Sequence, residues 1–280
     1  TAQFHPRHVL VTGGNRGIGR GIVERLLRQG HQVAFTCRNE VSGLGVADEL
    51  IEATGCNKSK VPVIVGDLST VAATYALART IREEFPTMQV MIHNAGLWPT
   101  ECFITEDGLE LSFMVNYMAL YILNQELLPL LEQNARKDLH SRVVLVTAGL
   151  FIFGKADIDK TPYGTDYGRA KTYMHTKQCG MIWCMHQAQK DKMESNTSSG
   201  HGRVTFTAVH PGVINTGLGD CGGCLGCLLR IVKTTWKSPI QGAEAPVWLA
   251  VSDEAENLNG VLYNEMKPFD NPKVGNASDA

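Results

Sequence analysis

The sequence predicts an α/β protein with a doubly wound, mostly parallel sheet and helices on both faces. Short runs rich in Val, Ile and Leu alternate with longer segments whose apolar residues recur at helical spacing. The apolar runs are nearly continuous, which is typical of strands buried on both sides. The segments between them are long enough for the right-handed helical crossovers that parallel strands require.

The first half of the chain alternates regularly between the two patterns. Residues 8–12 (HVLVT) form a β-branched run that glycines follow, and Gly30 stands where the next helix should end. Pro86 ends a third amphipathic segment. The predicted elements of this half are strands at 8–12, 32–37, 61–65 and 89–93 and helices at 18–29, 47–53 and 71–85.

The second half has longer helices and several irregular stretches. Its predicted elements are helices at 108–131, 173–190 and 246–251 and strands at 142–146, 204–209 and 260–264. The pattern breaks at 149–172, 191–202 and 217–226. The polar tail from Pro268 is expected to be loose. Because no linker separates two cores, we expect one domain over residues 1–280.

Composition excludes several classes of protein. Of 280 residues, 44% are hydrophobic, which a disordered chain would not reach. The 26 basic and 28 acidic side chains leave no positive excess for nucleic acid binding. No apolar run approaches the ~18 residues of a membrane span, and the first residues do not resemble a secretory signal. The eight scattered cysteines favour a reducing, cytoplasmic location.

A glycine-rich turn, TGGNRGIG, lies between the first predicted strand and the first helix. Gly13, Gly17 and Gly19 would let the backbone approach a pyrophosphate at the helix N-terminus. The strand–turn–helix context predicts a Rossmann-like dinucleotide site, and a turn without a ligand is the alternative.

The residues after the second strand indicate which dinucleotide is bound. NAD sites usually place a carboxylate there, whereas this strand ends in Thr36-Cys37-Arg38-Asn39. Arg38 offers a planar cation for a 2′-phosphate, and Arg16 in the glycine turn could oppose it. The sequence therefore favours NADP(H), with two solvated surface arginines as the alternative.

Two Tyr-x-x-x-Lys pairs lie close together, Tyr167 with Lys171 and Tyr173 with Lys177. A lysine four residues on lies one helical turn away, where its charge would lower the tyrosine pKa from about 10. The phenol could then protonate a carbonyl that receives a hydride. We favour the second pair because the buried-helix pattern continues after Lys177, whereas a helix begun at Tyr167 would be unusually long.

With TGGNRGIG, Asn94-Ala95-Gly96, a YxxxK helix and Pro211-Gly212 in this order, the chain resembles the short-chain dehydrogenase/reductase family. Several stretches look closest to its retinol dehydrogenase and carbonyl reductase branches, namely TCRN (36–39), TEDGLELSFMVNYMALYIL (105–123) and SPIQGAEAPVWLA (238–250). The resemblance runs from about residue 8 to residue 264 and also favours YMHTK, with Tyr173, as the active string.

The resemblance implies cofactor-binding positions along one edge of the sheet. These are Gly13, Asn15, Arg16, Gly17, Ile18, Gly19, Arg38, Asp67, Leu68, Asn94, Ala95, Gly96, Tyr173, Lys177, Pro211, Gly212, Val213 and Thr216. Asp67 would bind the adenine amino group, although it could instead cap the next helix, and Asn94 could be a turn residue.

The resemblance also implies two further catalytic roles, one of which this chain lacks. Asn116 would support a water link to Lys177, or else be an amide satisfied by neighbouring backbone. The family serine position, 25 residues before Tyr173, holds Ala148. Losing one hydrogen bond to the reacting oxygen could cost about 2.7–4 kcal/mol. Thr147 could substitute, although adjacent strand residues point to opposite faces.

The segment after Pro211-Gly212 is expected to form a substrate lid over about residues 214–240. Its cysteines Cys221, Cys224 and Cys227 have the spacing of a metal loop, but no fourth ligand stands nearby. We therefore expect a mobile apolar lid and no metal, with peripheral membrane contact left open.

Together these features predict an NADPH-dependent reductase of a hydrophobic ketone or aldehyde, or the reverse alcohol oxidation. The expected apolar pocket comprises Leu97, Trp98, Phe151, Phe153 and Leu218. Because Ala148 replaces the serine, a catalytically weak NADP(H)-binding sensor or scaffold is the alternative. The sequence leaves open whether the protein is a monomer or a homo-oligomer.

Overall fold

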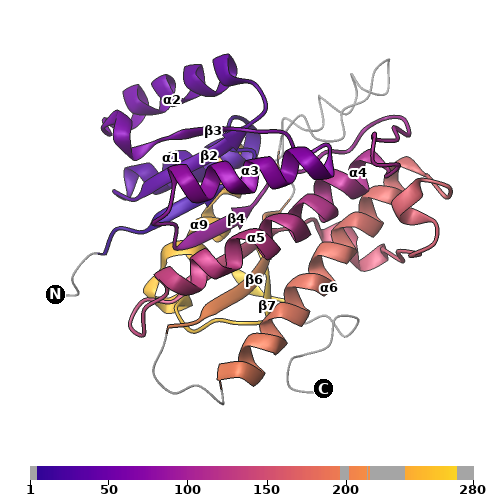
Figure 1. Ribbon diagram of the computed structural model, residues 1–280. Helices are drawn as coiled ribbons and strands as arrows, with labels where there is room; N and C mark the ends of the chain where they lie inside the picture. The colour runs from indigo at the N-terminus through magenta and orange to yellow at the C-terminus, as the bar shows by residue number, and fades with distance from the viewer. Residues whose placement is uncertain (1–4, 196–201, 213, 215–236, 270–280) are drawn as a thin grey trace.

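The computed structural model describes residues 5–195, 202–212, 214 and 237–269 (Figure 1). Eight strands in these ranges form one sheet with the order β3-β2-β1-β4-β5-β6-β7-β8. Strands β1 to β7 run parallel, and β8 pairs antiparallel with β7. The predicted fold class, a doubly wound and mostly parallel sheet, is confirmed. The prediction of a single domain remains a proposal.

All seven predicted strands are present, with ends that differ by no more than two residues from those expected. The strands are β1 (His8–Val11), β2 (Gln32–Cys37), β3 (Val63–Val65), β4 (Val90–His93), β5 (Ser141–Val146), β6 (Val204–His210), β7 (Val261–Asn264) and β8 (Lys267–Pro268). The tail was expected to be loose from Pro268, but this residue is in β8, opposite Tyr263. The hydrogen bond from the Phe269 N–H to the Leu262 carbonyl (2.8 Å) extends this pairing.

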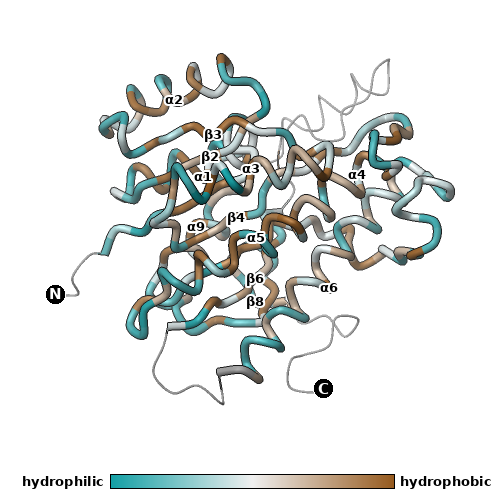
Figure 2. Tube along the Cα trace, viewed as in Figure 1, coloured by the Kyte–Doolittle hydropathy of each residue, from teal (hydrophilic) through white to brown (hydrophobic). Residues whose placement is uncertain are grey.

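Helices cover both faces of the sheet. They are α1 (Gly17–Arg28), α2 (Glu40–Thr54), α3 (Val71–Glu84), α4 (Leu111–Phe113), α5 (Ala119–Asn134), α6 (Arg169–Ser195), α8 (Pro239–Gly242) and α9 (Glu244–Val251). One core joins the sheet to α3, α5 and α6, which lie in front of it in Figure 1, and a second joins it to α1, α2 and α9. Figure 2 shows hydrophobic segments both in the central strands and along the helices that cover them. None of these helices has both the length and the apolarity needed to cross a lipid bilayer.

Three helices differ from the prediction for identifiable reasons. Helix α2 begins at Glu40 rather than residue 47, because the Asn39 side chain accepts a hydrogen bond from the Ser42 N–H (2.8 Å) and caps it. The helix expected over 108–131 begins at Leu111, passes through a π-helical turn, η2 (Met114–Met118), and continues as α5. Helix α6 has 27 residues, so helix length was a wrong argument against Tyr167.

The irregular segments also contain short helical turns. The described 3-10 turns are η1 (Lys58–Lys60), η3 (Gly149–Phe153), η4 (Thr161–Tyr163) and η5 (Asp253–Ala255). Of the predicted lid, Ile214 pairs with Lys237 in an isolated parallel bridge, and Ser238 starts α8 with a capping box. Residues 237–240 therefore belong to the folded body. Val213, Thr216, Leu218 and the cysteines at 221, 224 and 227 lie outside the described residues.

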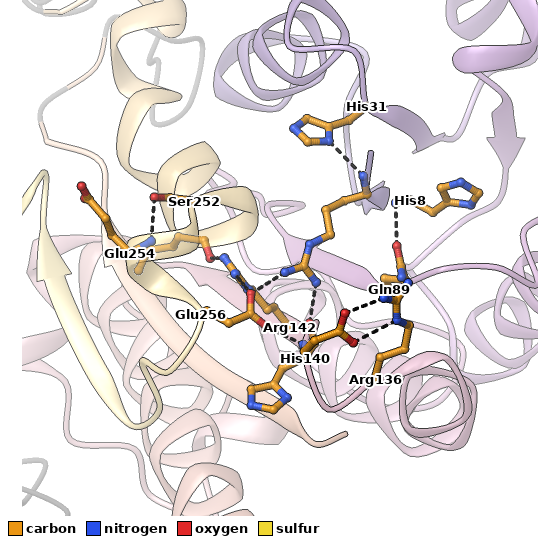
Figure 3. A network of polar contacts seen from close by, with 12 residues as sticks. His8, His31, Gln89, Arg136, His140, Arg142, Ser252, Glu254 and Glu256 are labelled. Atoms are coloured by element: carbon orange, nitrogen blue, oxygen red, sulfur yellow. Dashed lines mark hydrogen bonds and ion pairs between the residues drawn. The ribbon is translucent and has the colours of Figure 1, made fainter. Parts of the chain in front are cut away.

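A buried network of ion pairs lies at the end of the sheet where the parallel strands begin. The Arg142 guanidinium of β5 pairs with the carboxylate of Glu256 (Figure 3). The Arg7 guanidinium, from the residue before β1, pairs with the same carboxylate. Both arginines are 1% exposed. Burial alone would raise the pKa of Glu256, but the guanidiniums lower it below its usual range. Because either arginine would be a buried unpaired charge without Glu256, the network locks the two strands together.

Candidate active site

The glycine turn and the segment after β4 form one hydrogen-bonded unit. Strands β1 and β4 are neighbours at the point where the strand order reverses, which is where ligands bind in such sheets. The Asn94 side chain donates to the carbonyls of Thr12 (3.0 Å) and Gly13 (3.1 Å). The Thr12 hydroxyl accepts hydrogen bonds from the N–H groups of Asn94 (3.1 Å) and Ala95 (3.0 Å). Asn94 is thus a turn residue that shapes the predicted cofactor site.

The turn has the features that a dinucleotide needs. Gly13 and Gly17 adopt φ values of +68° and +54°, which L side chains rarely adopt. A Cβ at Gly19 would lie 2.3 Å from the Gly13 carbonyl oxygen, so the backbone approaches too closely for a side chain. Helix α1 begins after Arg16 with no side-chain cap, which leaves its first N–H groups available to phosphate oxygens. Asn15 and Ile18 flank this start and are half-buried.

Arg16 and Arg38 are both exposed. Neither forms an ion pair with another described residue. Arg20 of α1, by contrast, pairs with Glu49 (2.7 Å). Strand β2 ends at Cys37, and no carboxylate precedes Glu40. The two guanidiniums at this edge are therefore available to an anionic ligand.

The remaining predicted cofactor residues follow β3 and β6. Both carboxylate oxygens of Asp67 accept hydrogen bonds from Ser69 (3.0 and 2.9 Å), and Thr70 rather than Asp67 caps α3. Leu68 is buried in the core. Pro211 is buried and Gly212 has a φ of +91°. A Cβ at Gly212 would lie 2.5 Å from a Glu265 carboxylate oxygen, so this turn also requires glycine.

The π-helical turn places Asn116 between the segment after β4 and helix α6. Its side-chain oxygen accepts a hydrogen bond from the Leu97 N–H (2.8 Å), and its amide donates to the Leu97 carbonyl (3.0 Å) and the Thr176 hydroxyl (3.1 Å). Single π turns inside α-helices are frequent at functional sites. The Asn116 amide is therefore hydrogen-bonded to neighbouring groups, as the alternative interpretation of the sequence expected. It also joins the segment after β4 to helix α6.

Tyr173 and Lys177 lie one turn apart on α6 and are almost fully buried, with exposures of 3% and 8%. The Lys177 Nζ lies 5.8 Å from the centre of the Tyr173 ring and 3.5 Å from the Val146 carbonyl oxygen. Gly96 makes room for it, because a Cβ there would come within 3.3 Å of both Lys177 Nζ and Asn116 Oδ1. A cavity of about 10 Å³ beside Lys177, Asn116 and Thr12 has room for roughly one water.

Burial decides the charge state of the pair. It lowers the pKa of Lys177 from 10.5 to about 8 and raises the pKa of Tyr173 above its ordinary value of 10. The expectation that the tyrosine pKa is lowered is wrong for this arrangement, because burial of the phenol raises it. At neutral pH the phenol therefore holds its proton and Lys177 is mostly charged.

The other tyrosine–lysine pair does not converge. Tyr167 precedes α6, and its hydroxyl donates to the Pro99 carbonyl (3.2 Å). Lys171 is exposed and pairs with Asp166 (2.9 Å). Tyr167 thus holds the segment after β4, and Lys171 is a surface residue.

The alternation of side chains along β5 indicates which way Thr147 and Ala148, the two residues after this strand, point. Leu145 packs in the core under α5 and α6, and Val146 packs on the opposite face. The Thr147 N–H still bonds to the Val209 carbonyl (2.8 Å), so alternation turns Thr147 towards α5 and α6. Its hydroxyl is buried and has no hydrogen-bond partner among the described residues. Ala148 is extended and offers no hydroxyl.

The predicted apolar pocket is only partly assembled by the described residues. The Trp98 indole stacks on the Tyr173 ring with centroids 4.4 Å apart and an interplanar angle of 11°. Phe151 is instead 2% exposed in the core, and Phe153 is 62% exposed. The sequence reasoning missed Thr176, although a hydroxyl three residues after Tyr173 on a buried helix was a usable signal.

Comparison with known proteins identifies the family. The short chain dehydrogenase family model matches residues 7–153. Human retinol dehydrogenase 14 is 29% identical over 94% of this chain and 80% of its own, and zebrafish (Danio rerio) polyprenol dehydrogenase is 26% identical over 92% and 78%.

Solved structures agree on the fold. A short chain dehydrogenase from Shigella flexneri, crystallised with NADP, superposes with a TM-score of 0.69 at 21% identity, covering 93% of this chain and 97% of its own. One from Salmonella enterica serovar Typhi has a TM-score of 0.68 at 20% identity, with coverages of 94% and 97%. The family match, which spans more than half of the chain, identifies it as a member of the short-chain dehydrogenase family, an oxidoreductase similar to retinol dehydrogenases.

Proposed function

We propose that the protein is an NADPH-dependent reductase of a hydrophobic ketone or aldehyde, which also catalyses the reverse alcohol oxidation. The observation that carries this proposal is the buried pair Tyr173 and Lys177, one turn apart on α6 and beside Asn116, at the edge of the sheet that also holds the glycine turn. A neutral phenol next to a buried ammonium is suited to protonating an alkoxide.

Two further findings support the finer parts of the proposal. The guanidiniums of Arg16 and Arg38, which have no ion pair within the described residues, suit a 2′-phosphate, and the Shigella relative was crystallised with NADP. The relatives named for retinol and polyprenol act, by those names, on hydrophobic alcohols, and the indole of Trp98 gives this site an aromatic wall.

Each residue of the site has its own role in the proposed reduction of the carbonyl. A bound reduced nicotinamide would supply the hydride, with its phosphates at the start of α1. Tyr173 donates its proton to the carbonyl oxygen, and Lys177, held against the Val146 carbonyl, supplies positive charge as the phenolate forms. Asn116 positions the segment after β4 relative to α6. Thr147, whose buried hydroxyl has no hydrogen-bond partner in the part of the chain that the structure describes, substitutes for the hydroxyl that Ala148 lacks.

Replacing Tyr173 with Phe removes the proton donor and retains the stacked ring. We expect kcat for NADPH-dependent reduction of a panel of hydrophobic aldehydes, ketones and retinoids to fall by about 10²–10⁴-fold, the usual contribution of general acid catalysis. Tyr121→Phe, at an exposed tyrosine of α5, is the matched control and should leave kcat nearly unchanged. Undiminished turnover by Tyr173→Phe would refute the proposal, and saturable cofactor binding without any turnover would favour a sensor.

Replacing Arg38 with Gln tests the choice of cofactor. Because a hydrogen bond to a charged group contributes about 1.5–3 kcal/mol, the Kd for NADPH should rise about 10- to 100-fold while the Kd for NADH changes little. Arg20→Gln, which removes an ion-paired surface arginine from α1, serves as the control. Equal weakening of both dinucleotides would show that Arg38 does not read the 2′-phosphate.

Two substitutions just after β5 separate the contributions of positions 147 and 148. Ala148→Ser should raise kcat by less than the about 10²–10³-fold that a missing donor costs, because Thr147 already supplies one hydroxyl to the reacting oxygen. Thr147→Val should lower kcat and raise the melting temperature, because it removes a buried unpaired hydroxyl. Thr205→Val removes a similar hydroxyl from β6 and should raise stability alone. Unchanged kcat in Thr147→Val would exclude Thr147 from the reaction.

Replacing Lys177 with Met should abolish turnover and stabilise the fold. Folding lowers the Lys177 pKa from 10.5 to about 8, so the charged lysine destabilises the folded state below pH 8. Each pKa unit corresponds to about 1.4 kcal/mol, so Lys177→Met should gain a few kcal/mol in urea unfolding at pH 7. The gain should shrink as pH rises from 8 to 10.5. Lys171→Met, at an exposed site, should show neither effect, and a pH-independent gain would contradict the assignment.

A further inference from the structure

The side chain of Trp98 covers the proposed proton donor. The indole and the Tyr173 phenol lie nearly parallel, with centroids 4.4 Å apart, and the tyrosine is 3% exposed. A carbonyl oxygen must come within about 3 Å of the phenol oxygen to receive its proton. A bulky group next to that carbonyl would therefore collide with the indole.

The backbone on both sides of Trp98 is fixed. The N–H and the carbonyl of Leu97 are both bound by Asn116, and the Pro99 carbonyl accepts a hydrogen bond from Tyr167. Any adjustment to a substrate must therefore come from rotation of the indole about its own side-chain bonds.

The indole itself is held on the first turn of α6. Its Nε1–H donates to the Arg169 carbonyl (2.8 Å), and the Arg169 guanidinium lies over the ring, 5.7 Å from its centre. Arg169 and Tyr173 are four residues apart and so face the same side of the helix. These are one neutral hydrogen bond and two ring contacts, which a bound ligand can replace.

We propose that Trp98 is the specificity-determining gate of this site. With the indole stacked on Tyr173, only slender, unbranched carbonyl compounds reach the phenol, and bulky cyclic ketones require the indole to rotate away. Trp98 takes no part in the proton transfer, so it sets which substrates enter rather than how fast the bond forms. This inference rests on the proposed function, because it concerns access to the Tyr173 phenol.

The test compares decanal with 2-decalone, which have the same number of carbons but differ in girth. We expect Trp98→Met to raise kcat/KM for 2-decalone about tenfold or more relative to decanal, the scale on which steric fit discriminates substrates. Trp98→Phe keeps a ring over the phenol and should retain most of the wild-type preference. Trp248→Met is the matched control, because that half-buried indole lies on α9 and donates to Glu254 (3.2 Å).

The possible outcomes distinguish the proposal that Trp98 is a gate from the proposal that the protein is a reductase. A shifted ratio in Trp98→Met but not in Trp248→Met supports the gate. An equal fall for both substrates, or an unchanged ratio in an active and folded Trp98→Met, overturns it and leaves the reductase proposal intact. A wild-type protein that reduces neither compound nor any other carbonyl with NADPH overturns both proposals together.

Discussion

The side-chain amide of Asn116 joins three parts of the chain that are distant in sequence, and the rest of the site depends on this junction. It binds both the N–H and the carbonyl of Leu97 and donates to Thr176 on α6. The segment after β4 is thereby held against the helix that carries Tyr173 and Lys177. Since Asn116 reaches both from a π-helical turn, the local irregularity of the helix serves the geometry of the site.

Burial then sets the electrostatics of the pair that this junction positions. Excluding water from Tyr173 and Lys177 disfavours both charged forms, which raises one pKa and lowers the other. The phenol thus keeps its proton at neutral pH, as the proposed proton donor requires, and Lys177 stays mostly charged. The fold sustains this cost of placing a lysine in the interior because the sheet contributes two extensive apolar cores.

The two edges of the sheet have different tasks. At the amino-terminal edge, Arg7 and Arg142 both pair with Glu256, which holds β1 and β5 in place. At the carboxyl-terminal edge, the start of α1 has no side-chain cap, and the guanidiniums of Arg16 and Arg38 have no ion pair within the described residues. Paired charges stabilise a fold, whereas exposed cations and uncapped helix N–H groups at the carboxyl ends of parallel strands suit an anionic ligand.

The sequence by itself determined the order and type of the strands, because continuous apolar runs and helical periodicity are local properties. It also singled out candidates: the glycine turn and the Tyr173–Lys177 pair through short motifs of fixed spacing, and Asn116 through the family resemblance. Only the tertiary structure decided which tyrosine is buried beside a lysine, that burial raises the pKa of Tyr173, and that Trp98 covers that phenol. These properties depend on contacts between residues far apart in the chain, and desolvation arises only once the helices pack on the sheet.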